Sequence, residues 1–448
     1  MHHPFTPVAA VPVDPRRARV HEEGWQSRSP SGAYALDARP HRPADAASAT
    51  GGHRPGVTVP AGVFQGEGLL ALDPGDGSPV RLWAAPDPVH EVPSLRLTPA
   101  GPVAEISADR PVKEFTGPDI QAVLAEWASG LGVPAPRPAP TVWCSGHAYR
   151  TGAGGVSGTT EASGATEDDI HENLRAMDTL DLPIDVVLID DGHQKALGDW
   201  LTLSGRFRSR RGIAEAVRAR GRRAGIWTAP FLVDPGSDLA AGHPDWLVRT
   251  ADGGLAHAGR PRGRDLYVLD TTHPGAAAYL TEVFRTLRAE GYDCFRADFL
   301  SAGALDGVRH TPVDPLTAYR DGIALIRAAI GPEAYLLGSG APILPSIGLF
   351  DAMRVGPDTA PHRAPEAGDF SRPGQDAAEF TGAARQWQHG RFWTNDPDCL
   401  LARPVVETRE RWAAHMEATG GLRASGDRLL SLDPWGVDTT RRLLSGGE

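Results

Sequence analysis

Hydrophobic runs of two different kinds divide the chain into two parts. Between residues 57 and 115 the runs are short, many of them alternate with polar positions, and Gly, Pro or Asp separates them. This pattern predicts short antiparallel strands arranged as a small β-sandwich. A proline-rich linker at 133–140 then marks a domain boundary.

After this linker, strand-like apolar runs alternate with segments of helical period. The run at 185–190 is almost wholly apolar, which is typical of a parallel strand buried on both faces. Thr166 is a predicted helix N-cap, and a helix is predicted to open at Pro274 and close at Gly291. About eight strand–helix units fit into residues 141–430, which favours a closed (β/α)8 TIM barrel over an open sheet.

The predicted organisation therefore has five parts. Residues 1–55 are rich in Pro, Ala, Arg and His without a sustained period, and we expect them to be irregular or poorly ordered. A short β-sandwich-like domain follows at 56–132, and the linker occupies 133–140. The barrel takes up 141–430, and a short C-terminal tail ends the chain at 431–448.

Composition narrows the function classes. The formal net charge is -11 and no Lys/Arg-rich run occurs, so neither nucleic acid nor an acidic membrane is an expected partner. No apolar stretch approaches the ~20 residues of a membrane span, and the N-terminus lacks a signal-peptide pattern. Three separated cysteines indicate reduced thiols and a cytoplasmic protein. The 16 histidines show no metal-binding spacing and no nucleotide-binding glycine motif occurs, so neither metal nor cofactor is expected.

Two aspartates follow predicted strands at positions where a barrel places its chemistry. Asp298 ends the run that begins at residue 294, and Asp358 ends the run that begins at Arg354. Two carboxylates on different strands are the minimum for cleaving a glycosidic bond. Arg296 lies two residues before Asp298, on the same side of the strand, where it would keep Asp298 ionised. Taken singly, Asp298 also fits a helix N-cap and Asp358 a Pro-Asp turn.

Other candidates could contact a sugar. The adjacent carboxylates of Asp190 and Asp191 can accept hydrogen bonds from vicinal hydroxyls, although an Asp-Gly turn is the commoner meaning of this sequence. Trp143 and Trp227 end predicted strands and can either stack on a pyranose or fill the barrel core. The two acids in the segment 395–398 fit a structural turn better than a calcium loop.

Taken in order, these segments resemble the α-galactosidases of glycoside hydrolase family 36 and their clan. The resemblance covers about residues 141–430. It implies a retaining α-glycosidase on a (β/α)8 barrel without metal or organic cofactor. By the same resemblance, Asp298 is the nucleophile and Asp358 the acid/base, and Arg354 matches the arginine that precedes the acid/base. It also implies that Asp190 and Asp191 hold sugar hydroxyls and that Trp227 forms an aromatic wall. The matching segments are 143–145, 189–194, 198–200, 225–231, 243–246, 269–270, 296–299, 338–342, 354–358 and 395–398.

Four departures from the family pattern lie around the sugar pocket or its rim. Gly146-His147 stands where the family has Trp-Tyr, and His193 stands where it has Trp. Arg296 replaces a lysine, and Ser339 replaces a cysteine. Arginine keeps the positive charge but needs more room than lysine and presents a planar fork. Since both catalytic carboxylates remain, we expect retained chemistry with an altered substrate.

The expected function is that of a retaining, α-galactosidase-like glycosidase acting on a small-molecule glycoside or an oligosaccharide. A transglycosylase, or a tailoring glycosidase for a natural-product glycoside, would use the same residues and stays open. A carbohydrate-binding pseudoenzyme is a third alternative, motivated by the changed pocket positions. Family members are often oligomers, so a homo-oligomer is an option that the sequence leaves undecided.

Overall fold

Eight parallel strands form the central sheet of the protein, in a computed structural model that describes residues 4–43, 49, 52–149, 164–259 and 265–446. The hydrogen-bonded order is β18-β17-β16-β15-β12-β11-β10-β19. The amide of Leu422, just before β19, donates to the carbonyl of Asn395 in β18 at 2.8 Å, so the two ends of this order meet. The predicted (β/α)8 barrel is thereby confirmed. Its strands are β10 (Val142–Cys144), β11 (Val186–Ile189), β12 (Arg223–Thr228), β15 (Tyr292–Ala297), β16 (Tyr335–Gly338), β17 (Ala352–Arg354), β18 (Thr394–Asp396) and β19 (Ala424–Ser425).

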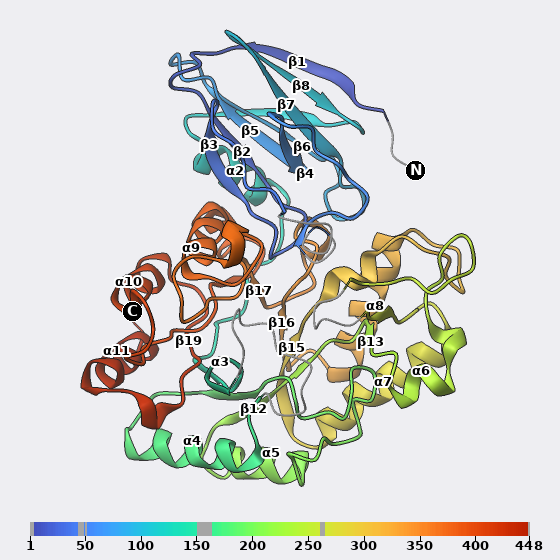
Figure 1. Ribbon diagram of the computed structural model, residues 1–448, viewed down its shortest axis with the longest axis vertical. Coiled ribbons are helices and arrows are strands. Elements are labelled where there is room, and N and C mark those ends of the chain that lie inside the picture. The colour runs from blue at the N-terminus through green and yellow to red at the C-terminus, as the bar shows by residue number, and fades with distance from the viewer. Residues whose placement is uncertain (1–3, 44–48, 50–51, 150–163, 260–264, 447–448) are drawn as a thin grey trace.

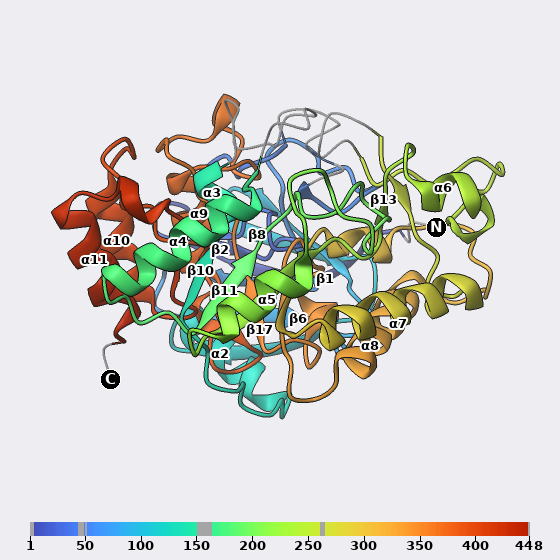
Figure 2. The ribbon, with the colours of Figure 1, turned by 90° about the horizontal axis from the view of Figure 1, so that it is seen from below.

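Helices cover the outside of the barrel. In Figure 2, α4, α5, α7 and α8 follow one another along this outer layer. They span Glu167–Thr179, Arg210–Arg218, Pro274–Ala289 and Pro315–Ile330. Thr166 caps α4 as predicted, and α7 begins at Pro274 with Leu280, Val283 and Phe284 among its buried residues.

Alternate strand residues belong to two separate hydrophobic clusters. Cys144 and Leu188 belong to the cluster inside the barrel, whereas Trp143 and Val187 pack with the helices outside it. The two-residue period of a strand therefore decides which side chains can reach the barrel interior.

The N-terminal part is a β-sandwich stacked on the barrel beside α9 (Gln375–Ala384) (Figure 1). One sheet has the order β1-β8-β7-β4 and the other β3-β2-β5-β6-β9. Phe380 of α9 packs on Tyr34 of β3, with ring centroids 5.6 Å apart. The strands are β1 (Thr6–Pro12), β2 (Arg19–Glu22), β3 (Gly32–Ala35), β4 (Phe64–Glu67), β5 (Leu69–Asp73), β6 (Val80–Ala84), β7 (Ser94–Ala100), β8 (Val103–Ala108) and β9 (Lys113–Gly117).

The prediction of an irregular segment at 1–55 is wrong for the residues that the structure describes there. Strands β1, β2 and β3 lie in this segment, and both sheets depend on them. Their partners are far away in the sequence, as when Thr6 pairs with Ala108, so no local period reveals them. The parts of this prediction at 1–3, 44–48 and 50–51 lie outside the described residues.

Three further helices pack elsewhere on the protein. Helix α2 (Ile120–Gly130) packs its Trp127 against Trp387 at 5.9 Å. Helices α10 (Arg409–Thr419) and α11 (Pro434–Leu444) lie together near the C-terminus (Figure 1). Among the residues that the structure describes, no helix combines the length and hydrophobicity needed to cross a membrane.

Candidate active site

The carboxyl ends of four barrel strands bring charged side chains together. Asp190 follows β11, Asp298 follows β15, and Arg354 and Asp396 end β17 and β18. All are buried, as is Arg296 within β15. Because the carboxyl ends of parallel strands open on the same side of a barrel, residues distant in sequence form one cluster there.

Both oxygens of Asp298 are held in place. Its Oδ1 accepts a hydrogen bond from the amide of Phe299 at 2.7 Å and lies 3.2 Å from a guanidinium nitrogen of Arg28. Its Oδ2 accepts from Trp227 Nε1 at 3.2 Å and lies 3.5 Å from Arg296. Phe299 has a φ of +52°, a left-handed conformation that is strained for a bulky residue. Donors on both oxygens fix the orientation of this carboxylate.

The surroundings of Asp298 favour its ionised form. Burial disfavours the charge, but the positive charges of Arg28 and Arg296 outweigh this effect and lower the pKa of Asp298. The negative charge of Asp358 acts in the opposite direction on that pKa and is outweighed as well. Asp298 is therefore a carboxylate at neutral pH, which is the form that a nucleophile needs.

Arg354 binds three carboxylates at once. Its guanidinium nitrogens lie 2.7 Å from Asp358 Oδ1, 3.1 Å from Asp396 Oδ2 and 2.7 Å from Asp398 Oδ1. Asp358 is the most accessible of the three, with 13% of its side chain exposed against 4% and 0%. Arg354 thus holds Asp358 against the barrel. Of the three carboxylates, Asp358 is the one that a substrate can best reach.

Removal of the Arg354 charge is expected to destabilise the fold. In Arg354→Leu, Asp396 and Asp398 lose a buried partner, and breaking a buried ion pair from one side costs about 3–5 kcal/mol. Urea unfolding followed by tryptophan fluorescence measures this free energy. Arg442→Leu removes an exposed pair with Glu417 and is the control, with an expected change within about 0.5 kcal/mol. Equal losses of unfolding free energy in the two variants would contradict the structural role of Arg354.

His147 extends the Arg354 network. Its Nε2 lies 2.9 Å from Asp398 Oδ1. Candidate ligand atoms of His147, Asp398 and Cys399 all lie within 4.8 Å of one another, which is close enough for a metal site. However, Asp398 Oδ1 also accepts from Arg354 and from the Cys399 amide, and its Oδ2 accepts from the Thr359 amide at 2.8 Å. The group is a complete hydrogen-bond network around Asp398, and we assign no metal to it.

Asp190 is linked to the nucleophile candidate through Arg296. Its Oδ2 lies 3.5 Å from Arg296 and accepts from Cys144 Sγ at 3.2 Å. A Cβ atom at Gly146 would lie only 2.9 Å from Asp190 Cγ. The glycine that departs from the family pattern therefore allows the chain to pass close to this carboxylate. Asp191 is less buried, and its Oδ1 accepts from Gln194 Nε2 at 2.7 Å.

The other predicted site residues take different positions. Trp227 reaches Asp298, but Trp143 lies outside the barrel interior and donates from Nε1 to the Asp427 carbonyl at 2.8 Å.

His193 is fully buried, with Nε2 2.9 Å from the Trp227 carbonyl, and burial lowers its pKa to about 4, so it is neutral. Ser339 is buried beside β15, where its amide donates to the Ala297 carbonyl at 2.8 Å.

Sequence reasoning missed Arg28 and underrated the acids at 395–398. Arg28 lies in the connection between β2 and β3, and 270 positions separate it from Asp298. No local pattern marks such a residue, because only the stacking of the sandwich on the barrel brings it to the site. Asp396 and Asp398 were predicted to form a structural turn, and they do organise local backbone, but they also anchor Arg354.

Comparison with known proteins identifies the family. The Melibiase family model matches residues 166–294. A solved α-galactosidase from Thermus thermophilus, TtGalA in complex with p-nitrophenyl α-D-galactopyranoside, superposes with a TM-score of 0.81 at 30% identity. The match covers 100% of this chain and 90% of that one. The chain belongs to the melibiase family of glycoside hydrolases, family 36.

More distant members of this family agree in fold. A family 36 α-galactosidase from Geobacillus stearothermophilus, AgaA, has a TM-score of 0.62 at 14% identity, with 98% of this chain and 61% of that one covered. Among curated sequences, an α-galactosidase from Escherichia coli is 32% identical over 117 residues, and AgaA is 30% identical over 119 residues. Each alignment covers 24% of this chain, but only 16% and 15% of the length of these two relatives.

Proposed function

We propose that the protein is a retaining α-glycosidase that hydrolyses an α-galactoside or a related glycoside. The observation that carries this proposal is the state of Asp298, an ionised carboxylate at the end of β15 with donors on both oxygens. Membership of a glycoside hydrolase family supports it. TtGalA has been solved with p-nitrophenyl α-D-galactopyranoside and with stachyose, which makes α-galactosides the first substrates to test.

The proposed reaction is a double displacement. Asp358 donates a proton to the leaving oxygen while Asp298 attacks the anomeric carbon, so that a covalent glycosyl-enzyme forms. Asp358 then removes a proton from water, which cleaves the ester and releases the sugar. In this proposal Arg296 and Asp190 supply fixed charge near the oxocarbenium-like transition state, where preorganised charge is most effective.

Neighbouring residues complete the proposed sugar site. In this proposal Trp227, which lies beside Asp298, contributes an aromatic surface, and the carboxylates of Asp190 and Asp191 accept hydrogen bonds from hydroxyls. We also propose a cytoplasmic location, because Cys144, Cys294 and Cys399 are buried free thiols.

A panel of 4-nitrophenyl glycosides tests the function and names the sugar. The α-galactoside, α-N-acetylgalactosaminide, β-L-arabinopyranoside and α-glucoside are each incubated with the protein, and nitrophenolate release is followed. We expect turnover of the α-galactoside, with free sugar as the product. Transfer of the sugar to an added alcohol as the main product would indicate a transglycosylase instead. Sugar binding by calorimetry without any turnover would favour a binding protein and contradict the proposal.

A further inference from the structure

Arg28 is the only contact of the N-terminal sandwich with Asp298 that the described residues show. Its guanidinium lies 3.2 Å from Asp298 Oδ1, and its Cζ lies 4.3 Å from the centroid of the Phe299 ring. Both contacts are with the nucleophile segment that follows β15. A flexible side chain held by an ion pair and by an aromatic face has a defined position.

The loop that carries Arg28 is docked firmly on the barrel. The amide of Ser27 donates to the Ala341 carbonyl at 3.1 Å, and the amide of Ile343 donates to the Trp25 carbonyl at 3.0 Å. A β-bridge joins Gln26 to Pro342 between these bonds. The loop therefore adds a short antiparallel pairing to the segment that follows β16, at the same end of the barrel as Asp298.

Arg385 also binds this loop to the barrel. It is fully buried and lies 2.7 Å from Glu23, with further hydrogen bonds to the Ser27 and Gln26 carbonyls at 2.8 and 3.1 Å. The same guanidinium donates to the Val355 carbonyl at 2.9 Å, one residue after β17. One arginine thus fixes the sandwich loop to the strand that leads to Asp358.

We propose that Arg28 is a positioning residue, supplied by the N-terminal sandwich, that sets the reactivity of the Asp298 carboxylate in the two steps of the reaction. This inference rests on the proposed function. In the glycosyl-enzyme Asp298 is an uncharged ester, and its negative charge returns only when water breaks the bond between the anomeric carbon and Oδ. Arg28 stabilises that returning charge and so assists the second step.

The same contact contributes less to the first step. Arg28 stabilises the free carboxylate, and attack on the anomeric carbon consumes the charge that it stabilises. Its loss is therefore expected to slow hydrolysis of the glycosyl-enzyme more than its formation.

The pH dependence follows from the charges around Asp298. Arg28 from the sandwich loop and Arg296 from β15 lower its pKa, while Asp358 after β17 raises it, and Asp190 after β11 acts through Arg296. Asp298 must be ionised to attack, so activity is present above its pKa and is lost as the pH falls through it. Without Arg28 this acid limb moves to higher pH in the profile of kcat/KM, which reports the ionisation of the free enzyme.

The test compares Arg28→Gln with the wild type on 2,4-dinitrophenyl α-galactoside, whose good leaving group makes the first step fast. We expect kcat to fall about 10- to 100-fold, the effect of one lost hydrogen bond to a charged group. We expect kcat/KM to fall less, glycosyl-enzyme to accumulate in intact-protein mass spectra, and the acid limb to move to higher pH. Arg28→Lys keeps the charge and should retain most of the wild-type profile.

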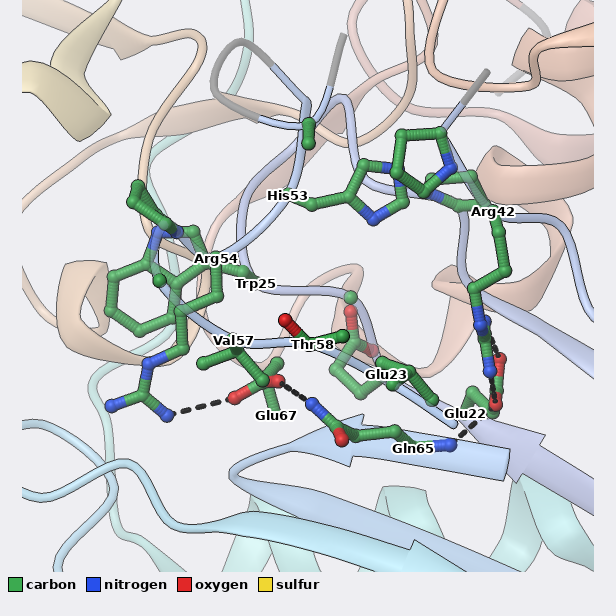
Figure 3. A pocket seen from close by; sticks show the side chains of 17 residues that line it. Glu22, Glu23, Trp25, Arg42, His53, Arg54, Val57, Thr58, Gln65 and Glu67 are labelled. Atoms are coloured by element: carbon green, nitrogen blue, oxygen red, sulfur yellow. Dashed lines mark hydrogen bonds and ion pairs between the residues drawn. The ribbon is translucent and has the colours of Figure 1, made fainter. Parts of the chain in front are cut away.

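Arg54 provides the matched control. It also belongs to the sandwich, lies 4.9 Å from the ring of Trp25 in the same loop, and pairs with an acid, Glu67, at 2.8 Å. Arg54, Trp25 and Glu67 all line a cavity of about 430 Å³ that neither Arg28 nor Asp298 lines. Figure 3 shows the pair of Arg54 and Glu67 there. Arg54→Gln should leave KM and the acid limb of the kcat/KM profile unchanged. If it behaves like Arg28→Gln, or if Arg28→Gln lowers kcat and kcat/KM equally with no shift in pH, the inference is overturned.

A second measurement keeps this inference separate from the proposed function. In protein labelled with 13C at the aspartate carboxyl carbons, the resonance missing from Asp298→Asn reports the titration of Asp298 without any turnover. Its midpoint should be higher in Arg28→Gln than in the wild type. An unchanged midpoint overturns the role of Arg28 even if the wild type is active, and a raised one supports it even if no tested glycoside is cleaved.

Discussion

Replacement of Asp298 by asparagine is expected to abolish turnover of α-galactosides while the fold remains intact. Asparagine matches the shape of aspartate and its oxygen can still accept from the Phe299 amide, but an amide neither carries the charge nor forms the glycosyl ester. Loss of a residue that acts covalently commonly costs ~10⁴-fold or more in kcat. Arg296 keeps Asp190 as a partner, so no buried arginine is left without a carboxylate.

Asp351 offers a matched control for this experiment. It also lies next to a barrel strand and is bound by two arginines, Arg137 at 2.8 Å and Arg327 at 2.9 Å. However, it precedes β17 and so lies at the amino end of the strands. Residues at that end of a barrel usually stabilise the fold and take no part in catalysis. Initial rates and circular dichroism are measured for both variants. Asp351→Asn should keep turnover, and a rate near wild type in Asp298→Asn would remove the nucleophile assignment.

The barrel could be predicted because its signals are local. A parallel strand buried on both faces reads as a continuous apolar run, and β11 is fully buried along its length. Helix α7 is indicated by Pro274 at its first turn and by an apolar stripe at helical spacing. The position of Asp298 could be predicted for the same reason, since a residue directly after such a strand is placed by the fold itself.

The sandwich strands and the charged side chains around Asp298 and Arg354 are set by contacts between distant segments. Strand β1 is exposed at most positions, and its pairing with β8 determines that it is a strand at all. Arg28 and Arg385 look like ordinary arginines in polar segments, yet each lies between the sandwich and the barrel. Asp396 and Asp398 are informative only when Arg354 is seen between them. Long-range pairing and buried ion networks leave no periodic trace in a single sequence.

Charge connects these missed residues with the predicted ones. Arg28 and Arg296 act on Asp298, Arg354 holds Asp358, and Arg385 joins the backbone of β17 to the sandwich loop. Removal of the N-terminal sandwich would therefore change the electrostatics of the barrel site as well as its stability. The proposed active site is thus a property of both parts of the chain.

Replacement of Asp358 by alanine is expected to separate the two steps of the reaction. A general acid typically contributes 10²–10⁴-fold, and that contribution matters most for a poor leaving group. Hydrolysis of an alkyl α-galactoside, whose alcohol is a poor leaving group, should therefore fall further than hydrolysis of 2,4-dinitrophenyl α-galactoside. The dinitrophenyl substrate should still form glycosyl-enzyme, which then accumulates because no base activates water. Arg354 retains Asp396 and Asp398, so the variant should fold.

Azide identifies the role of each aspartate by the stereochemistry of its product. In Asp358→Ala, azide needs no base and attacks the glycosyl-enzyme, so the rate should recover and the product should be the α-galactosyl azide. In Asp298→Gly, azide takes the place of the missing nucleophile and attacks the substrate directly, which gives the β-galactosyl azide. Proton NMR of the two products distinguishes the anomers. A β-azide from Asp358→Ala would exchange the roles of the two residues, and equal losses on both substrates without any azide product would exclude Asp358 as the acid/base.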